Sequence, residues 1–370
     1  METKLVRIAE ISATSKHPIF TSVYHLINED MLKQCHKELD GNKAVGIDKV
    51  TKDEYGKNLD RNIKELVQRL KNKSFKPLPS LRVYIPKGNG KKRPLGIASY
   101  EDKIVQMAVK KILGAIYEPR FLNCMYGFRP NRGCHEAIKE VYQRISYGKI
   151  SYIVDADIKG FFDHIDHDWM MKFLEWNIQD KNLLWLIRKY LKAGIMEQGK
   201  FEPTEEGSAQ GSVMSPMLAN IYMHHVLTLW FKLVVQREMQ GECFHVNFAD
   251  DFVAGFQYKS EAERYYKELK ERMEKFEQKV RAYKNWIYDN RNRPMREIIK
   301  ELNVKLIGHY RYYGVTWNFR KITTFLHRVQ QFLFKAMNRR GCRRAYTWNG
   351  FVEMLKYYPL AKPKTYYCLY

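Results

Sequence analysis

Acidic side chains are scarce in this chain of 370 residues. Its 41 Asp and Glu stand against 64 Lys and Arg, so the formal net charge is +23. An excess of that size favours an extended polyanion as the partner. The 25 Tyr, 19 Phe and 7 Trp add flat surfaces on which bases or ribose can stack. Composition therefore favours nucleic-acid binding over the alternative of a basic protein with some other role.

Closely spaced cysteines are missing as well. The six cysteines lie far apart and form no C-x-x-C pair, which excludes zinc ribbons, zinc knuckles and redox dithiols. Scattered free thiols suit a reducing cytosol. The opening stretch "METKLVRIAEISATSK" has no apolar core of signal-peptide length, and we expect no run apolar enough to span a bilayer. We therefore expect a cytoplasmic protein without a membrane partner.

The first hundred residues predict helices followed by a strand hairpin. Residues 1 to about 75 are polar, and "YGKNLDRNIKELVQRLKN" repeats apolar residues at helical spacing. Residues 77–99 instead alternate as in a strand and turn at "KGNGKK". No G-K-[ST] follows Gly90, so this is not a nucleotide-binding P-loop. The basic hairpin is either a solvated turn or a clamp that closes over phosphates.

The middle of the chain predicts further helices and a basic break between two of them. Arg129 and Arg132 lie in "YGFRPNRG", where they are either phosphate ligands or ordinary loop arginines. The cluster "DHIDHD" suggests a metal-dependent phosphohydrolase, but Asp166 is better explained as a helix cap. "AQGSVMSPMLANIYMHHVLTLWFKLV" predicts a mostly buried helix with Ser215 as its cap and Pro216 in its first turn.

Two adjacent carboxylates interrupt an apolar pattern in "HVNFADDFVAG", residues 245–255. Asp250 and Asp251 lie between two runs that should pair as strands, and neighbouring like charges are costly unless a cation offsets them. A second predicted strand, from Ser151 to about Asp157, carries Asp155 and Asp157 on one face because side chains alternate along a strand.

Two-metal phosphoryl transfer needs carboxylates from more than one strand, because the two ions lie about 4 Å apart. Asp157, Asp250 and Asp251 meet this need if their strands are neighbours in one sheet. Two Mg²⁺ ions would then supply the missing positive charge, with water and substrate phosphates completing their coordination. The alternative is an ordinary turn that happens to contain two aspartates.

The last part of the chain is helical and strongly basic. Residues 291–370 contain 17 Lys and Arg against 3 Glu, and aromatic residues are interleaved with Arg311 and Arg320. This combination favours an RNA surface over a simple solvated face. Four further arginines form a compact candidate cluster: Arg339, Arg340, Arg343 and Arg344. We place a domain boundary between residues 1–278 and 279–370.

Five blocks, in order, resemble the group II intron-encoded reverse transcriptases and maturases. They are "YIPKGNGKKRPLGI", "YGFRPNRGCHEAI", "DADIKGFFDHI", "QGSVMSPMLANIY" and "NFADDFVAGF". "RPMREIIKELNVKLIGHYRYYGV" and "AYTWNGFVEMLKYYPLAKP" resemble the start and end of the family's thumb and maturase region. The resemblance extends over nearly the whole chain from about residue 28. Reverse transcriptases linked to defence share the central blocks, but the maturase-like end favours an intron origin.

The resemblance implies an α+β fold of the right-hand polymerase type. Fingers and an antiparallel palm sheet backed by helices would occupy residues 1–278, and a helical thumb with an RNA-binding maturase region would occupy residues 279–370. It also implies roles for individual residues. Asp157, Asp250 and Asp251 match the metal-binding aspartates. Four more positions match nucleotide-binding residues: Lys87, Arg93, Phe162 and Gln210. Phe248 stands where tyrosine is commoner.

The implied function is RNA-directed DNA polymerisation with two Mg²⁺ ions, together with maturase activity in splicing and retrohoming. The implied partners are the intron RNA, an RNA template, a DNA primer or target and dNTPs, in a cytoplasmic ribonucleoprotein; no protein partner is inferred. One departure matters: the strand with a lysine-threonine pair and the primer-gripping hairpin that usually follow the palm are absent. The chain is then an RNA-binding splicing factor with impaired polymerase, a divergent polymerase, or a sequence that lacks one stretch.

Overall fold

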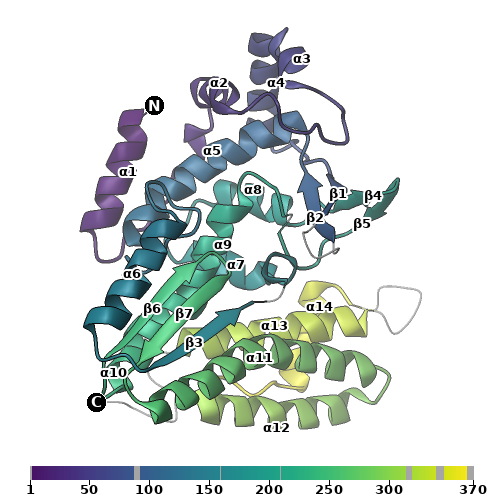
Figure 1. Ribbon diagram of the computed structural model, residues 1–370. Helices are drawn as coiled ribbons and strands as arrows, with labels where there is room; N and C mark the ends of the chain where they lie inside the picture. The colour runs from purple at the N-terminus through teal and green to yellow at the C-terminus, as the bar shows by residue number, and fades with distance from the viewer. Residues whose placement is uncertain are drawn as a thin grey trace. The chain divides into compact units, whose positions relative to one another are not determined.

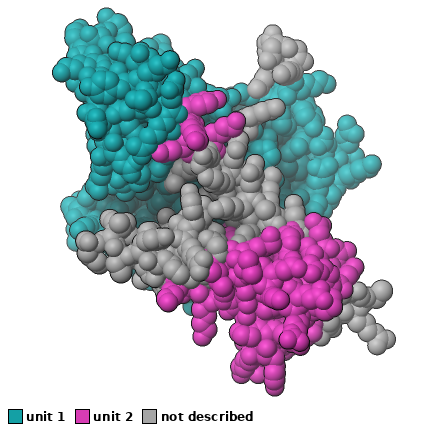
Figure 2. Space-filling view, turned by 90° about the horizontal axis from the view of Figure 1, so that it is seen from below, with its two compact units in different colours: residues 1–265 teal, residues 266–370 magenta. Residues whose placement is uncertain are grey.

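The computed structural model describes residues 2–86, 92–158, 160–208, 210–313, 319–338 and 346–364, without the side chains of 2, 271–285, 308–313, 319–322 and 324. The chain divides into two compact units, Met1–Tyr265 and Tyr266–Tyr370, which Figure 2 colours separately. The division falls within helix α11 (Lys259–Asp289). It therefore comes earlier than the boundary that we placed after residue 278.

The first unit begins with the helices that the sequence predicts. Two of them have defined caps: the Asn28 side chain accepts from the Met31 amide, and Thr51 forms a capping box with Glu54, which satisfies amides left free at a helix start. These helices are α1 (Glu2–Thr14), α2 (Glu29–Glu38), α3 (Lys52–Gly56) and α4 (Leu59–Lys71). The apolar side of α4 is buried, as its spacing predicts.

The predicted basic hairpin is confirmed. Strands β1 (Ser80–Pro86) and β2 (Lys92–Ile97) pair antiparallel, and the connecting residues 87–91 lie outside the described part of the chain. Strand β1 also pairs in parallel with β4 (Ile195–Glu197), which forms a second hairpin with β5 (Lys200–Glu202). The resulting sheet has the order β2-β1-β4-β5.

Two apolar helices form much of the core of this unit. Helix α5 (Tyr100–Tyr117) buries most of its length. Helix α9 (Ser215–Met223) continues through two π-helical turns, His224–Thr228 and Phe231–Val235, into α10 (Gln236–Glu238). The N-cap of α9 is Met214, so the prediction of Ser215 as the cap is wrong. Ser215 is the first helical residue, and its hydroxyl lies 2.5 Å from that of Ser208.

The expectation that no segment is apolar enough to span a bilayer is wrong for the helical segment Ser215–Glu238. By length and composition it is long and apolar enough to cross a membrane. However, 67% of its most apolar window is buried within the protein. Burial inside a folded unit gives this helix the role of a core helix, because its apolar side chains are already covered by protein.

The central sheet of the first unit has the order β3-β7-β6, all antiparallel. Its strands are β3 (Tyr152–Asp157), β6 (Cys243–Phe248) and β7 (Asp251–Phe256), and Figure 1 shows them side by side. One face is covered: Phe252, Ala254 and Phe256 are at most 3% exposed, and the rings of Phe231 and Tyr265 pack against that of Phe256. On the other face, Asp155, Asp157 and Asp251 are exposed.

Three further helices complete the first unit. They are α6 (Cys134–Tyr147), α7 (His167–Glu175) and α8 (Lys181–Leu191). Ala137 of α6 packs with Phe244 and Val246 of β6. Asp166 caps α7 by accepting from the Trp169 amide at 2.9 Å, as predicted. His167 is buried and its Nε2 donates to the Gly207 carbonyl. Asp166 and His167 therefore both have structural roles, and neither of them supports a phosphohydrolase site.

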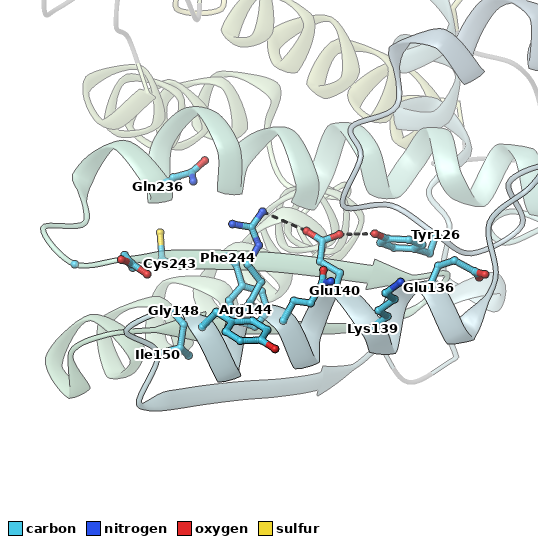
Figure 3. Close-up of a pocket in the computed structure, with 14 residues that line it drawn as sticks. Tyr126, Glu136, Lys139, Glu140, Arg144, Gly148, Ile150, Gln236, Cys243 and Phe244 are labelled. Atoms are coloured by element: carbon cyan, nitrogen blue, oxygen red, sulfur yellow. Dashed lines mark hydrogen bonds and ion pairs between the residues drawn. The ribbon is translucent and has the colours of Figure 1, made fainter.

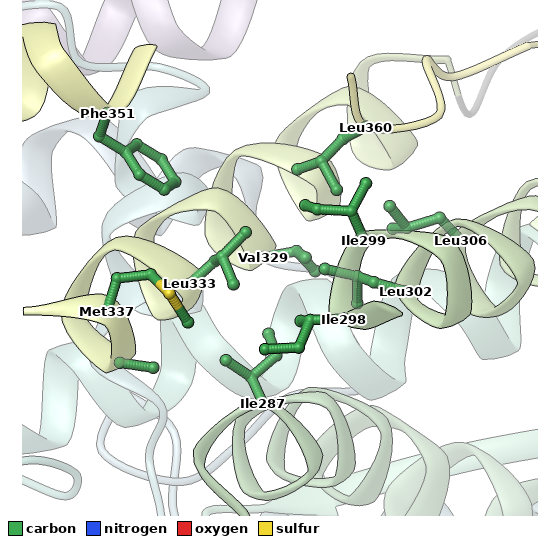
Figure 4. Packing of buried hydrophobic residues seen from close by; sticks show 11 residues of the cluster. Ile287, Ile298, Ile299, Leu302, Leu306, Val329, Leu333, Met337, Phe351 and Leu360 are labelled. Atoms are coloured by element: carbon green, nitrogen blue, oxygen red, sulfur yellow. The ribbon is translucent and has the colours of Figure 1, made fainter. Parts of the chain in front are cut away.

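The second unit is built from helices around a core of its own. Beyond the later part of α11 these are α12 (Met295–Tyr313), α13 (Phe319–Met337) and α14 (Trp348–Tyr357). Ile298, Leu302, Leu333 and Phe351 are fully buried and come from three of the helices; Figure 4 shows the cluster. The helical character that the sequence predicts for this region is confirmed.

Candidate active site

Two of the predicted metal-binding aspartates lie directly opposite one another. In the ladder between β3 and β7, Asp157 pairs with Asp251, and Asp155 pairs with Val253 on the same face. Residues opposite each other in an antiparallel pair have Cβ atoms about 4.5–5.5 Å apart. The condition set by the sequence, that the two strands be neighbours, is therefore met.

Asp250 lies in the two-residue turn that joins β6 to β7. Phe248 pairs with Asp251 across this hairpin, which leaves Ala249 and Asp250 as the turn residues. Ala249 has a φ of +60° and is buried. A left-handed conformation is uncommon for a residue other than glycine and is kept only where the surroundings hold it.

The electrostatics of the carboxylate face fit a cation. Partial burial raises the pKa of Asp251, and the negative charges of Asp250, Asp157 and Asp155 raise it further. Oxygen ligands of this kind suit Mg²⁺, which is usually held by one or two carboxylates with water and substrate phosphates. Among the described residues, no three acidic, His or Cys side chains are already gathered at metal-binding distances. The carboxylate oxygens therefore suit the predicted ion chemically, although the described side chains are not already arranged around one.

The segments that carry Phe162, Gln210 and Arg93 are joined by backbone hydrogen bonds. The Ser208 amide donates to the Phe162 carbonyl at 2.7 Å, and the Gly96 amide of β2 donates to the Gln210 carbonyl at 2.6 Å. Phe162 is buried in the short helical turn that follows β3, and Arg93 is exposed on β2. These three predicted nucleotide-binding residues thus lie on connected elements. Lys87 lies outside the described residues.

The loop that contains Gln210 is also held from helix α5. The buried Gln106 side chain accepts hydrogen bonds from the Ser212 hydroxyl at 3.0 Å and from the Val213 amide at 3.1 Å. Gly211 has a φ of +105°, and a Cβ there would approach the Gly96 carbonyl to 3.1 Å. The loop is therefore fastened between α5 and the β1–β2 hairpin.

Arg129, one of the predicted RNA-binding residues, is turned inward onto its own loop. Its side chain is buried, donates through Nε to Glu118 at 2.6 Å and through Nη1 to the Leu122 and Met125 carbonyls at 2.9 Å each. Nη2 also donates to the Glu118 carbonyl at 3.4 Å, so four of the five guanidinium N–H donors serve the protein's own chain. The contacts of Arg129 therefore hold its own loop together, and its contact with RNA stays a prediction.

Arg132 is more accessible than Arg129. Its guanidinium donates to the backbone and side chain of Asn123 and lies 5.4 Å from the ring centre of Tyr126. The remaining predicted RNA-binding residues lie outside the described side chains: Arg311, Arg320, Arg339, Arg340, Arg343 and Arg344.

An open groove of about 940 Å³ lies between α6 and β6. Figure 3 shows Glu140 between Tyr126 and Arg144, with which it forms a hydrogen bond and an ion pair. The lining contains both acidic and basic side chains, and the predicted metal-binding aspartates are not part of it. The groove is therefore separate from the candidate active site.

A comparison with known protein families shows to which family the chain that carries this site belongs. Residues 85–311, more than half of the chain, match the family described as reverse transcriptase (RNA-dependent DNA polymerase). The chain belongs to the reverse transcriptase family. All three predicted metal-binding aspartates of this reverse transcriptase fall within the matched residues.

Three relatives give the match more detail. The reverse transcriptase is 38% identical over 238 residues to the group II intron-encoded protein LtrA of Lactococcus lactis subsp. cremoris, covering 63% of this chain and 39% of LtrA. It is 37% identical over 187 residues to protein YkfC of Escherichia coli (strain K12), covering 50% and 49%. It is 30% identical over 93 residues to nuclear intron maturase 1, mitochondrial, of Arabidopsis thaliana, covering 25% and 13%. The chain thus spans less than half the length of these relatives.

Solved structures are more distant. A partial Cas6-RT-Cas1–Cas2 complex has a TM-score of 0.38 at 17% identity, covering 71% of this chain and 42% of the other. An apo telomerase from Candida tropicalis, truncated from its C-terminal domain, has a TM-score of 0.41 at 12% identity, covering 53% and 47%. Neither likeness bears on the chemistry of the site.

The sequence reasoning missed three residues that contact the site's loops: Gln106, Gly127 and Asn247. Gln106 resembles any polar residue within a helix, and Asn247 resembles any polar residue in a strand. Gly127 carried a weak signal, because a glycine within an ordered motif often marks a close backbone approach. Contacts between segments distant along the chain were needed to find the other two.

Proposed function

We propose that this reverse transcriptase is an RNA-directed DNA polymerase of the group II intron-encoded type, which also binds its intron RNA and assists splicing and retrohoming. The observation that carries the proposal is the pairing of Asp157 with Asp251 beside Asp250. In this proposal, the first unit provides fingers and palm of a right-hand polymerase, and the second unit provides the thumb and maturase region. The protein acts in the cytoplasm as a ribonucleoprotein.

Each part of the site has a defined task in this reaction. Two Mg²⁺ ions, held by Asp157, Asp250 and Asp251, would offset the carboxylate charges and stabilise negative charge that develops on the transferred phosphate. Arg93 and Lys87 would hold the triphosphate, and the Gln210 loop would contact the incoming dNTP. The buried ring of Phe162 would exclude a ribose 2′-hydroxyl, which selects deoxynucleotides.

Primer extension on an RNA template tests the proposal. With poly(rA)/oligo(dT), Mg²⁺ and dTTP, the wild-type chain is expected to extend the primer, and Asp250→Ala is expected to abolish extension while leaving RNA affinity nearly unchanged. Asp53→Ala, which removes an exposed aspartate from α3, is the matched control and should extend normally. A wild-type chain that fails to extend any primer, or equal loss of extension and RNA binding in Asp250→Ala, would reject the proposal.

A second candidate function is an RNA-binding splicing factor without polymerase activity. It is favoured by the region after β7, where the described residues contain helix α11 as far as Asp289 and no further strand. The primer-gripping hairpin implied by the resemblance has no counterpart there. In this case the wild-type chain would promote intron splicing without extending a primer, and Asp250→Ala would splice equally well.

A further inference from the structure

The turn that carries Asp250 is held from within the sheet by one buried amide side chain. Nδ2 of Asn247 lies 2.8 Å from the Ala249 carbonyl and 3.4 Å from the Asp251 carbonyl. Asn247 is fully buried. Both neighbours are carbonyl acceptors, so the amide must present its NH₂ group to them. A single side chain therefore spans the turn on both sides of Asp250.

The backbone of the same residue ties the turn to a second segment. The Asn247 amide donates to the Cys124 carbonyl at 2.8 Å, and the Asn247 carbonyl accepts from the Tyr126 amide at 2.9 Å. These bonds fix residues 124–126 along the outer edge of β6, in a parallel bridge. Asn247 is thus the point at which the "YGFRP" segment meets the catalytic hairpin.

The backbone of Gly127 lies directly against the same turn. A Cβ on Gly127 would lie 2.2 Å from the Ala249 nitrogen and 3.0 Å from the Phe248 carbonyl carbon, so no other residue fits without moving the turn. The buried Asn220 of α9 donates to the Gly127 carbonyl at 2.8 Å. Ala249, in its left-handed conformation, is therefore enclosed between Asn247 and Gly127.

We propose that Asn247 is a positioning residue for the metal-binding carboxylates, with Gly127 as its counterpart across the turn. The inference rests on the proposed function. Asn247 contacts neither metal nor substrate; it holds Ala249 and the Asp251 backbone so that Asp250 and Asp251 face Asp157. Without its NH₂ group, the Ala249 carbonyl loses its partner and the turn relaxes from a conformation that its own sequence does not favour.

A variant of similar size without the NH₂ group isolates this role. Asn247→Val removes the NH₂ group and its hydrogen bonds. It also removes Oδ1, which is buried without a partner among the described residues. Removing an unpartnered buried polar atom is favourable, and this limits the loss of stability. Asn177→Val is the matched control, because Asn177 is also buried and donates to a distant carbonyl, that of Pro18.

Mn²⁺ affinity of the full chain, measured by electron paramagnetic resonance of the free ion, provides a readout besides activity. Residues that orient metal ligands typically contribute about 10- to 100-fold to metal affinity or rate. We expect Asn247→Val to weaken Mn²⁺ binding by about tenfold and to lower kcat by about tenfold or more, because misplacement by about 1 Å costs about a hundredfold. The KM for dNTP and the RNA affinity should change less than twofold. Asp250→Ala defines non-specific ion binding.

The outcomes separate this inference from the proposed function. The inference is overturned if Asn247→Val binds Mn²⁺ as tightly as wild type, or if its binding is weakened no more than that of Asn177→Val. It is also overturned if the wild-type chain binds no more Mn²⁺ than Asp250→Ala. If Asn247→Val does not fold, Gly127→Ala in the same assays displaces the turn by its added Cβ and should weaken Mn²⁺ binding similarly. A wild-type chain that binds Mn²⁺ but does not extend primers rejects the polymerase, while the ion affinities still decide the role of Asn247.

Discussion

Asp157 and Asp251 are paired across the last position of the β3–β7 ladder. Their segments are separated along the chain by several helices and a second hairpin, so the pairing is a long-range contact. It brings like charges together on an exposed sheet face, where Asp155 is also located. The repulsion has consequences for stability and pH dependence that can be measured.

Removing one of these charges should stabilise the metal-free protein. In Asp251→Asn the repulsion from Asp250, Asp157 and Asp155 disappears. The gain in unfolding free energy should be below about 1 kcal/mol, because solvent screens exposed charges. Thermal melting in EDTA measures the gain, and primer extension should be lost in the same variant. A lower melting temperature in EDTA would show that repulsion does not dominate at this site.

The same repulsion predicts how activity depends on pH. Because the pKa of folded Asp251 is raised, protons bind the folded chain more tightly than the unfolded one. The ionised Asp251 carboxylate therefore destabilises the folded chain. This destabilisation is absent below the pKa that Asp251 has in the unfolded chain, and it appears as pH rises through the pKa that Asp251 has in the folded chain. Metal and protons compete for the same carboxylate. Primer extension at limiting Mg²⁺ should fall on acidification, and saturating Mg²⁺ should move the midpoint to lower pH; identical midpoints would contradict this.

Gln106 should influence nucleotide binding through the loop that contains Gln210. Gln106→Leu leaves the buried Ser212 hydroxyl and the Val213 amide without their acceptor, which costs about 1–3 kcal/mol. We expect the KM for dNTP to rise severalfold while RNA affinity stays constant. Steady-state primer extension over a range of dTTP concentrations measures this, with Gln34→Leu on the exposed side of α2 as the control. An unchanged KM would exclude a positioning role for Gln106.

Arg129 and Arg132 should differ sharply although they lie three residues apart. Arg129→Met removes a buried guanidinium from its ion pair with the partly buried Glu118 and should destabilise the chain by up to about 3–5 kcal/mol. Arg132→Met should change stability by less than about 1 kcal/mol. Denaturant unfolding compares the two. Equal destabilisation would show that both arginines hold the loop to the same degree.

The arginine cluster near the end of the chain should control the salt dependence of RNA binding. Replacing Arg339, Arg340, Arg343 and Arg344 by Gln should weaken RNA affinity and flatten the plot of log affinity against log salt by about 0.7 for each lost single-strand phosphate contact. Filter binding at several KCl concentrations measures the slope. Replacing Lys33, Arg61, Lys64 and Lys71 in α2 and α4 by Gln removes the same charge elsewhere. An unaltered slope would place the cluster outside the interface.

Much of the fold could be predicted from local patterns. The alternation in residues 77–99 and 151–157 identified strands, and the helical spacing in "YGKNLDRNIKELVQRLKN" identified α4. One prediction failed for a local reason as well. Ser215 does not cap its helix but is the first helical residue, and its hydroxyl bonds that of Ser208.

The sequence by itself determined which carboxylates face the same way, because side chains alternate along each strand and this depends only on neighbouring residues. It also predicted a cation beside the adjacent aspartates. Only the tertiary structure decided that β3 pairs with β7, that Arg129 is turned inward onto Glu118, and that Asn247 and Gly127 enclose Ala249. Such contacts join segments far apart along the chain, and their geometry depends on how helices and strands pack together, which no local pattern specifies.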